Sequence, residues 1–83
     1  MEIGQIVYSK NGRGKGCAFV VLAVEGEYVY LTDGETRPMH KPKKKKAKHT
    51  QPTHGKAKCV SAGKKGLLDA HIRKCLKEFA KNQ

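Results

Sequence analysis

Residues 4–24 read GQIVYSKNGRGKGCAFVVLAV, two apolar runs on either side of a glycine-rich loop. Valine, isoleucine, tyrosine and phenylalanine favour β-strands, and glycine favours the turns that join them. The stretch therefore predicts an antiparallel hairpin, with strands over residues 2–9 and 17–24.

Two more strand-like runs follow this hairpin. Residues 27–32, EYVYLT, predict a third strand, and Asp33-Gly34 is a dipeptide that favours a two-residue hairpin turn. Residues 35–40, ETRPMH, then predict a fourth strand, placed at a sheet edge because Pro38 has no N–H to donate. Short strands at this spacing predict a small, strongly bent sheet that closes into a barrel.

The C-terminal segment changes from strand-like to helical periodicity. Apolar side chains at helical spacing predict an amphipathic helix over residues 67–83, and the residues on this apolar face are Leu68, Ile72, Cys75, Leu76 and Phe79. A helix of about fifteen residues is marginal alone, so we expect it to dock on the barrel or on a partner. The sequence thus predicts a barrel domain over residues 1–53, a basic Gly/Lys linker over 54–66 and the helix.

The 83-residue chain has a formal net charge of +11, and the charge is concentrated in its second half. Residues 1–40 carry four Lys or Arg against five acids, whereas residues 41–83 carry fourteen against two. Ten lysines and no acid lie between residues 41 and 66. Such a distribution indicates a polyanionic partner.

The stretch from Gly4 to Val24 resembles a KOW motif, with a glycine that opens a strand, a G-x-x-K-G loop over residues 12–16 and a second strand. The resemblance continues through residue 53, and it is closest to short KOW-domain RNA-binding proteins related to large-subunit ribosomal proteins. Phe19 stands where many KOW motifs have a further glycine. The resemblance implies an SH3-like β-barrel whose last strand, residues 47–53, follows the lysine run.

The loop and the lysine run are the predicted RNA contacts. The loop glycines let the backbone approach a phosphate, while the run, tied at both ends, is expected to hold its lysines near one face and grip the RNA backbone. About six phosphate contacts would give a log–log salt slope of about −4 on single strands and about −5 on duplex. Two tyrosines share one face of the third strand and would stack on unpaired bases or cover the core. The predicted RNA-binding residues are Lys10, Arg13, Lys15, Lys41, Lys43, Lys44, Lys45, Lys46, Lys48, Tyr28 and Tyr30, and the loop glycines are Gly12, Gly14 and Gly16.

Several alternatives remain open for these residues. Residues 42–48, PKKKKAK, also resemble a nuclear localisation signal, and duplex DNA is another polyanion that they would attract. A polybasic membrane patch would need a lipid anchor or an apolar insertion face, and the sequence indicates neither. The main alternative function is an SH3-like protein-interaction module of the transcription or translation machinery.

Metal and enzyme sites are not expected. His71 and Cys75 lie one helical turn apart, but the chain has no CxxC or compact Cys/His spacing of the kind that zinc modules use. No paired carboxylates or activated nucleophile stand out, so we expect no catalysis, cofactor or small-molecule substrate. Three cysteines without a close pair are typical of reduced thiols in the cytoplasm. The sequence therefore predicts a cytoplasmic, ribosome-associated protein that binds RNA, with ribosomal RNA as the expected ligand.

Overall fold

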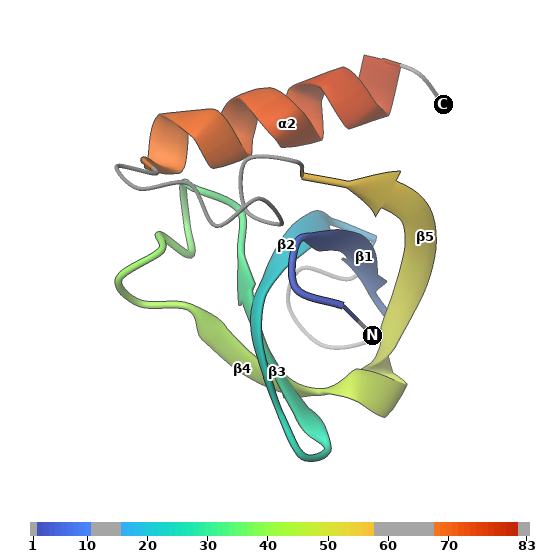
Figure 1. The fold of residues 1–83 in the computed structure, drawn as a ribbon. Helices are drawn as coiled ribbons and strands as arrows, with labels where there is room; N and C mark the ends of the chain where they lie inside the picture. The colour runs from blue at the N-terminus through green and yellow to red at the C-terminus, as the bar shows by residue number, and fades with distance from the viewer. Residues whose placement is uncertain (1, 11–15, 58–67, 82–83) are drawn as a thin grey trace.

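The computed structural model describes residues 2–10, 16–57 and 68–81, which form a five-stranded sheet and a C-terminal helix (Figure 1). The elements are β1 (Gln5–Ser9), β2 (Ala18–Glu25), β3 (Tyr28–Thr32), β4 (Lys43–Lys46), the 3₁₀ turn η1 (Ala47–His49), β5 (Thr50–Lys56) and α2 (Asp69–Lys81). Neighbouring strands are antiparallel, in the order β4-β3-β2-β1-β5. The prediction of a mostly β fold with one C-terminal helix is confirmed.

The sheet is strongly curved, and its two edge strands, β4 and β5, are joined through η1 (Figure 1). Register shifts between Gln5 and Val7 and between Val21 and Ala23 mark bulges, which bend strands locally. Across the described residues β4 and β5 do not pair with each other. The predicted closure is therefore corrected: the sheet curls without closing into a barrel.

Each face of the curled sheet carries its own apolar cluster, because successive side chains of a strand point to opposite faces. The inner cluster lies on the concave face and consists of Val7, Phe19, Val21, Val29 and Leu31. The helix-side cluster lies between the other face and α2 and consists of Ile6, Val20, Ala57 and Ile72. Docking of the helix on the sheet, one of the two outcomes expected from its length, is thus confirmed.

Helix α2 is held by apolar packing against the sheet and by hydrogen bonding to the loop after β3. Ile72 is fully buried, and Cys75, Leu76 and Phe79 pack around it in the helix-side cluster. Asp69 Oδ1 accepts a hydrogen bond of 2.7 Å from the Met39 N–H. Leu68, which was predicted on the apolar face, is 60% exposed because it precedes the helix, whose first residue is Asp69.

Gly55 of β5 lies directly against the Phe79 ring of α2. A Cβ atom there would lie 2.5 Å from two ring carbons of Phe79, so Gly55→Ala is expected to lower the free energy of unfolding by about 1–3 kcal/mol through overpacking. Urea denaturation would measure the loss. Adding Phe79→Leu should recover part of it, and strictly additive effects of the two substitutions would contradict a direct contact.

The segment after β3 is a closed loop, and the prediction of a fourth strand over residues 35–40 is wrong. The Asp33 carboxylate accepts hydrogen bonds from the N–H groups of Glu35 and Arg37, each at 2.8 Å, and from Thr36 Oγ1 at 2.6 Å. These N–H groups are therefore not available to a strand ladder, and Pro38 has none. The lysine run takes the place of the predicted strand and pairs with β3 as β4.

The two-residue hairpin turn lies at Gly26-Glu27, between the paired residues Glu25 and Tyr28, and not at Asp33-Gly34 as predicted. Gly26 has φ 58° in the first central position, where a type II′ turn requires glycine. Gly34 also has positive φ, at 76°, but it belongs to the longer loop that connects β3 with β4.

The Asp33 hydrogen bonds predict an acid-sensitive loop. Burial alone would raise the pKa of Asp33, but the hydrogen bonds from Thr36, Arg37 and Glu35 outweigh it and hold the pKa below its ordinary value. A carboxyl whose pKa is lower in the folded state stabilises the fold above its unfolded pKa of about 3.9, and this contribution is lost as the pH falls through the folded pKa.

We therefore expect Asp33→Ala to lower the free energy of unfolding by about 1–2 kcal/mol at pH 7, as the loss of a capping side chain does. The difference from the wild type should shrink as the pH falls from the unfolded pKa of about 3.9 through the lower pKa of Asp33 in the folded state. Urea denaturation at several pH values measures both effects. Glu35→Ala removes the same charge from an exposed position of this loop and serves as the control. A deficit of Asp33→Ala that did not change with pH would contradict the prediction.

The last strand extends past the predicted end of the barrel domain. Strand β5 continues to Lys56, three residues beyond residue 53, and Ala57 donates its N–H to the Gly4 carbonyl at 2.7 Å. Residues 58–66 of the predicted linker lie outside the described residues.

Candidate nucleic-acid interface

The lysine run is itself a strand, and strand geometry divides its lysines between two faces. In β4, Lys43 and Lys45 pair with Leu31 and Val29, whereas Lys44 and Lys46 pair with Tyr30 and Tyr28. Directly paired residues share a face. The expectation that the whole run presents one cationic face is therefore wrong: Lys44 and Lys46 form an outer row, and Lys43 and Lys45 form an inner row.

The outer row lies beside the two predicted tyrosines. Lys44 Nζ is 4.6 Å from the centroid of the Tyr28 ring and 6.0 Å from that of Tyr30. Both rings are half-buried, and the residues that alternate with them, Val29 and Leu31, are fully buried. The tyrosines therefore lie on the outer face, next to the basic strand, as one of the two predicted alternatives stated. Tyr8 instead packs near Phe79, with ring centroids 6.2 Å apart.

The inner row reaches over the rim of the concave face. Lys45 Nζ donates a hydrogen bond of 2.7 Å to Ser9 Oγ, and Lys43 Nζ lies 6.0 Å from the Phe19 ring centroid. Burial, with a smaller contribution from repulsion by Lys43, lowers the pKa of Lys45. The stems of these two lysines cover apolar surface at the edge of the inner cluster, which explains how an all-lysine segment completes a sheet.

The base of the glycine-rich loop meets the end of the lysine run. The Lys10 N–H donates to the His49 carbonyl at 2.9 Å, and the Gly16 N–H donates to the Ser9 carbonyl at 2.9 Å, which closes the loop. Lys10 is exposed. The structure thus places Lys10, one of the cations predicted to bind RNA at the loop, next to η1. Gly12, Arg13, Gly14 and Lys15 lie outside the described residues.

The remaining lysines of the site flank β4. Lys41 precedes the strand, and Lys48 lies in η1; both are exposed. Within residues 2–10, 16–57 and 68–81, no carboxylate forms an ion pair with Lys41, Lys44, Lys46 or Lys48. Lys46 and Lys48 also line a shallow hollow of about 220 Å³ together with Glu27 and Ala47.

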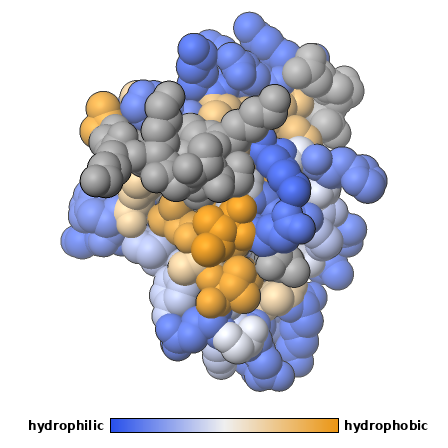
Figure 2. Space-filling model, in the orientation of Figure 1, coloured by the Kyte–Doolittle hydropathy of each residue, from blue (hydrophilic) through white to orange (hydrophobic). Residues whose placement is uncertain are grey.

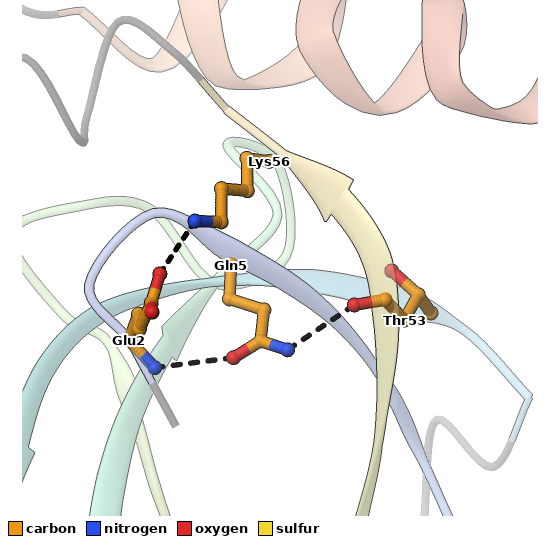
Figure 3. A network of polar contacts seen from close by, with 4 residues as sticks. All are labelled: Glu2, Gln5, Thr53 and Lys56. Atoms are coloured by element: carbon orange, nitrogen blue, oxygen red, sulfur yellow. Dashed lines mark hydrogen bonds and ion pairs between the residues drawn. The ribbon is translucent and has the colours of Figure 1, made fainter.

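Lys56 is set apart from these cations by an ion pair on β5. Its ammonium lies 2.6 Å from Glu2 Oε2, and Gln5 links the Glu2 N–H to the Thr53 carbonyl (Figure 3). The hydrogen bond from Lys56, reinforced by its charge, lowers the pKa of Glu2. This network joins the N-terminal residues to the end of β5 and compensates the charge of Lys56.

The cations of α2 have different surroundings from those of β4. Arg73 Nη1 donates to the Gly34 carbonyl at 2.6 Å, so this guanidinium fixes the helix to the loop after β3. Lys74 and Lys77 line an open groove of about 770 Å³ that also contains Asp33 and Glu35. The helix therefore braces the sheet, and the cations beside this groove lie near acids.

Sequence reasoning missed two residues of the site. Ser9 anchors Lys45, but a serine at a strand end gives no signal of this role. Phe19 lies next to Lys43, and only the pairing of β3 with β4 brings the two together.

No group of three His, Cys, Asp or Glu side chains is placed to hold a metal ion in the described part of the chain. Among the same residues no helix has the length and apolarity needed to cross a membrane. No protein-family model and no curated protein sequence matches the chain.

Proposed function

We propose that the protein binds RNA through β4 and the adjoining face of β3, and that the RNA is ribosomal RNA on the ribosome. One observation carries this proposal: an edge strand composed entirely of lysines lies against two tyrosines, and its outer-row lysines have no carboxylate partner among the described residues. Holding uncompensated lysines together costs repulsion, which a polyanion relieves. Phosphates of an RNA backbone supply that charge and release counterions on binding.

The arrangement of the strands supports an SH3-like fold of the KOW type for this binding domain, with the sheet curled but not closed. Five short antiparallel strands curl around the inner cluster, the glycine-rich loop joins the first two, and the basic segment leads into the last. We propose a binding function without catalysis, exercised in the cytoplasm. Cys17 is a free thiol, as cysteines in proteins of that compartment commonly are.

Fluorescence anisotropy with a structured ribosomal RNA fragment tests the binding proposal. Lys41, Lys44, Lys46 and Lys48 have no carboxylate partner within the described ranges, and four such phosphate contacts predict a log–log salt slope of about −3 on single-stranded RNA, shallower than six contacts would give. Duplex DNA and unpaired RNA of equal length serve as competitors. Absence of binding at low salt would contradict the proposal, and a clear preference for duplex DNA would favour the DNA alternative.

Ultraviolet crosslinking in cells, followed by sequencing of the attached RNA, tests the ribosomal part of the proposal. A cluster of crosslinks at one ribosomal RNA site is expected. Crosslinks distributed in proportion to RNA abundance would reduce the function to general polyanion affinity. Associations that survive RNase treatment would instead favour the protein-interaction module.

A further inference from the structure

Lys44 occupies the surface on which a base would have to stack. Its ammonium lies 4.6 Å from the Tyr28 centroid and 6.0 Å from the Tyr30 centroid, in the range where a cation is attracted to the face of an aromatic ring. A base that stacks on this face of Tyr28 competes with the lysine for it. In this arrangement the base would have to displace the lysine first.

The rings and the lysine differ in their places in the sheet. Both tyrosines belong to β3, an inner strand of the sheet that pairs with β2 and β4, and Val29 and Leu31 between them are fully buried. Lys44 lies on the edge strand and is exposed, so its ammonium remains accessible to a ligand while it rests on the rings. A long lysine side chain loses rotamer freedom when it grips a phosphate, and contacts that hold it beforehand reduce that cost.

The spacing of the two lysines in the outer row also fits the spacing of phosphates along an RNA backbone. Side chains two residues apart in a strand are separated by about 6.8 Å, close to the distance between neighbouring phosphates of an extended polynucleotide. Lys44 and Lys46 have this spacing on one face of β4. Lysine binds phosphate as a point charge and does not select among bases.

We propose that Tyr28 and Tyr30 are positioning residues for Lys44, and that the site grips the sugar-phosphate backbone of RNA without stacking on its bases. This inference rests on the proposed RNA binding and names the part of the RNA that the site recognises. Tyr28 has the larger share because it lies nearer the ammonium. The hydroxyl of Tyr30 is directed to Glu25, at 3.5 Å.

A double-mutant cycle on RNA affinity tests the inference, with Tyr28→Leu, Lys44→Met and the two combined. Tyr28→Leu alone is expected to weaken binding about two- to five-fold, the range of an exposed cation–π contact. In the Lys44→Met background the same substitution should have no further effect, because the group that Tyr28 positions is absent. Tyr28→Phe, which keeps the ring, should bind within about two-fold of the wild type.

An equal loss from Tyr28→Leu in both backgrounds would show direct contact of the ring with RNA and overturn the inference. Replacing unpaired bases of the RNA by abasic sites gives a second readout: unchanged affinity is expected, and a matching loss would indicate stacking. Thermal midpoints of all variants exclude unfolding as the cause. Wild-type protein that binds no RNA would overturn both proposals, whereas binding with additive losses overturns only this one.

Discussion

Replacing Lys44 and Lys46 with glutamine is expected to weaken RNA binding about 25-fold at 0.1 M salt and to flatten the log–log salt slope by about 1.4 on single-stranded RNA. Each phosphate contact contributes about 0.7 to that slope, and the affinity it supplies grows as the salt concentration falls. Both lysines lie on the outer row, and neither has a carboxylate partner among the described residues. Salt titrations by fluorescence anisotropy measure affinity and slope together.

The helix supplies a matched control for this pair. Lys74→Gln with Lys77→Gln removes the same charge from exposed positions of α2, beside the groove that contains Asp33 and Glu35. We expect at most a few-fold loss of RNA affinity from the control pair. Charges outside the binding surface act mainly through the overall electrostatic field of the protein. Equal losses from the two pairs would mean that net charge, and not the outer row, determines binding.

Gly34→Ala is expected to have the largest effect on stability, lowering the free energy of unfolding by about 2–4 kcal/mol. About 1 kcal/mol comes from a side chain at φ 76°, and about 1–3 kcal/mol from overpacking. A Cβ atom there would lie 2.5 Å from the Asp69 carbonyl oxygen and 3.0 Å from Arg73 Cγ. A backbone atom cannot move aside alone, so the first turn of α2 must shift and loosen the Arg73 hydrogen bond to Gly34.

Gly26→Ala separates the two causes. Gly26 also has positive φ, at 58°, but a Cβ atom there would have no neighbour within 4 Å. This variant should therefore lose only the conformational part, about 1 kcal/mol. Urea denaturation measures the loss in the free energy of unfolding for each variant, and the difference between the two losses is the part due to the contact with α2. Equal losses at the two glycines would contradict a close contact between Gly34 and the helix.

Much of this fold follows from local patterns in the sequence. Alternation in β3 correctly put the two tyrosines on one face and Val29 and Leu31 on the other, because the period of a strand is fixed by its geometry, and the structure shows that the face of Val29 and Leu31 is the buried one. The spacing of Ile72, Cys75, Leu76 and Phe79 located the face of α2 that docks on the sheet. These elements depend on residues that are near one another in the chain.

The errors arose where tertiary contacts override local preference. The KOW resemblance places the last strand after the lysine run and so predicts residues 43–46 as a connection. In the structure they pair with β3 as an edge strand although lysine has a low strand propensity, because the lysine stems can lie on apolar surface. Asp33-Gly34 has a sequence typical of a tight hairpin, but the Asp33 carboxylate organises a longer loop instead. The first of these errors also hid the division of the candidate site into two rows. Side chains alternate between two faces in a strand, whereas a connection has no such fixed alternation.

An edge strand made only of lysine also governs how the protein behaves at high concentration. In the described part of the chain β4 pairs only with β3, and an edge strand of this kind can be joined by a further strand, which is how sheet proteins begin to aggregate. Two copies meeting along β4 would bring like charges opposite one another, and this repulsion keeps the chains apart. Screening by concentrated salt, or acetylation of these lysines, removes that protection. We therefore expect the positive edge to oppose self-association of the protein at low salt.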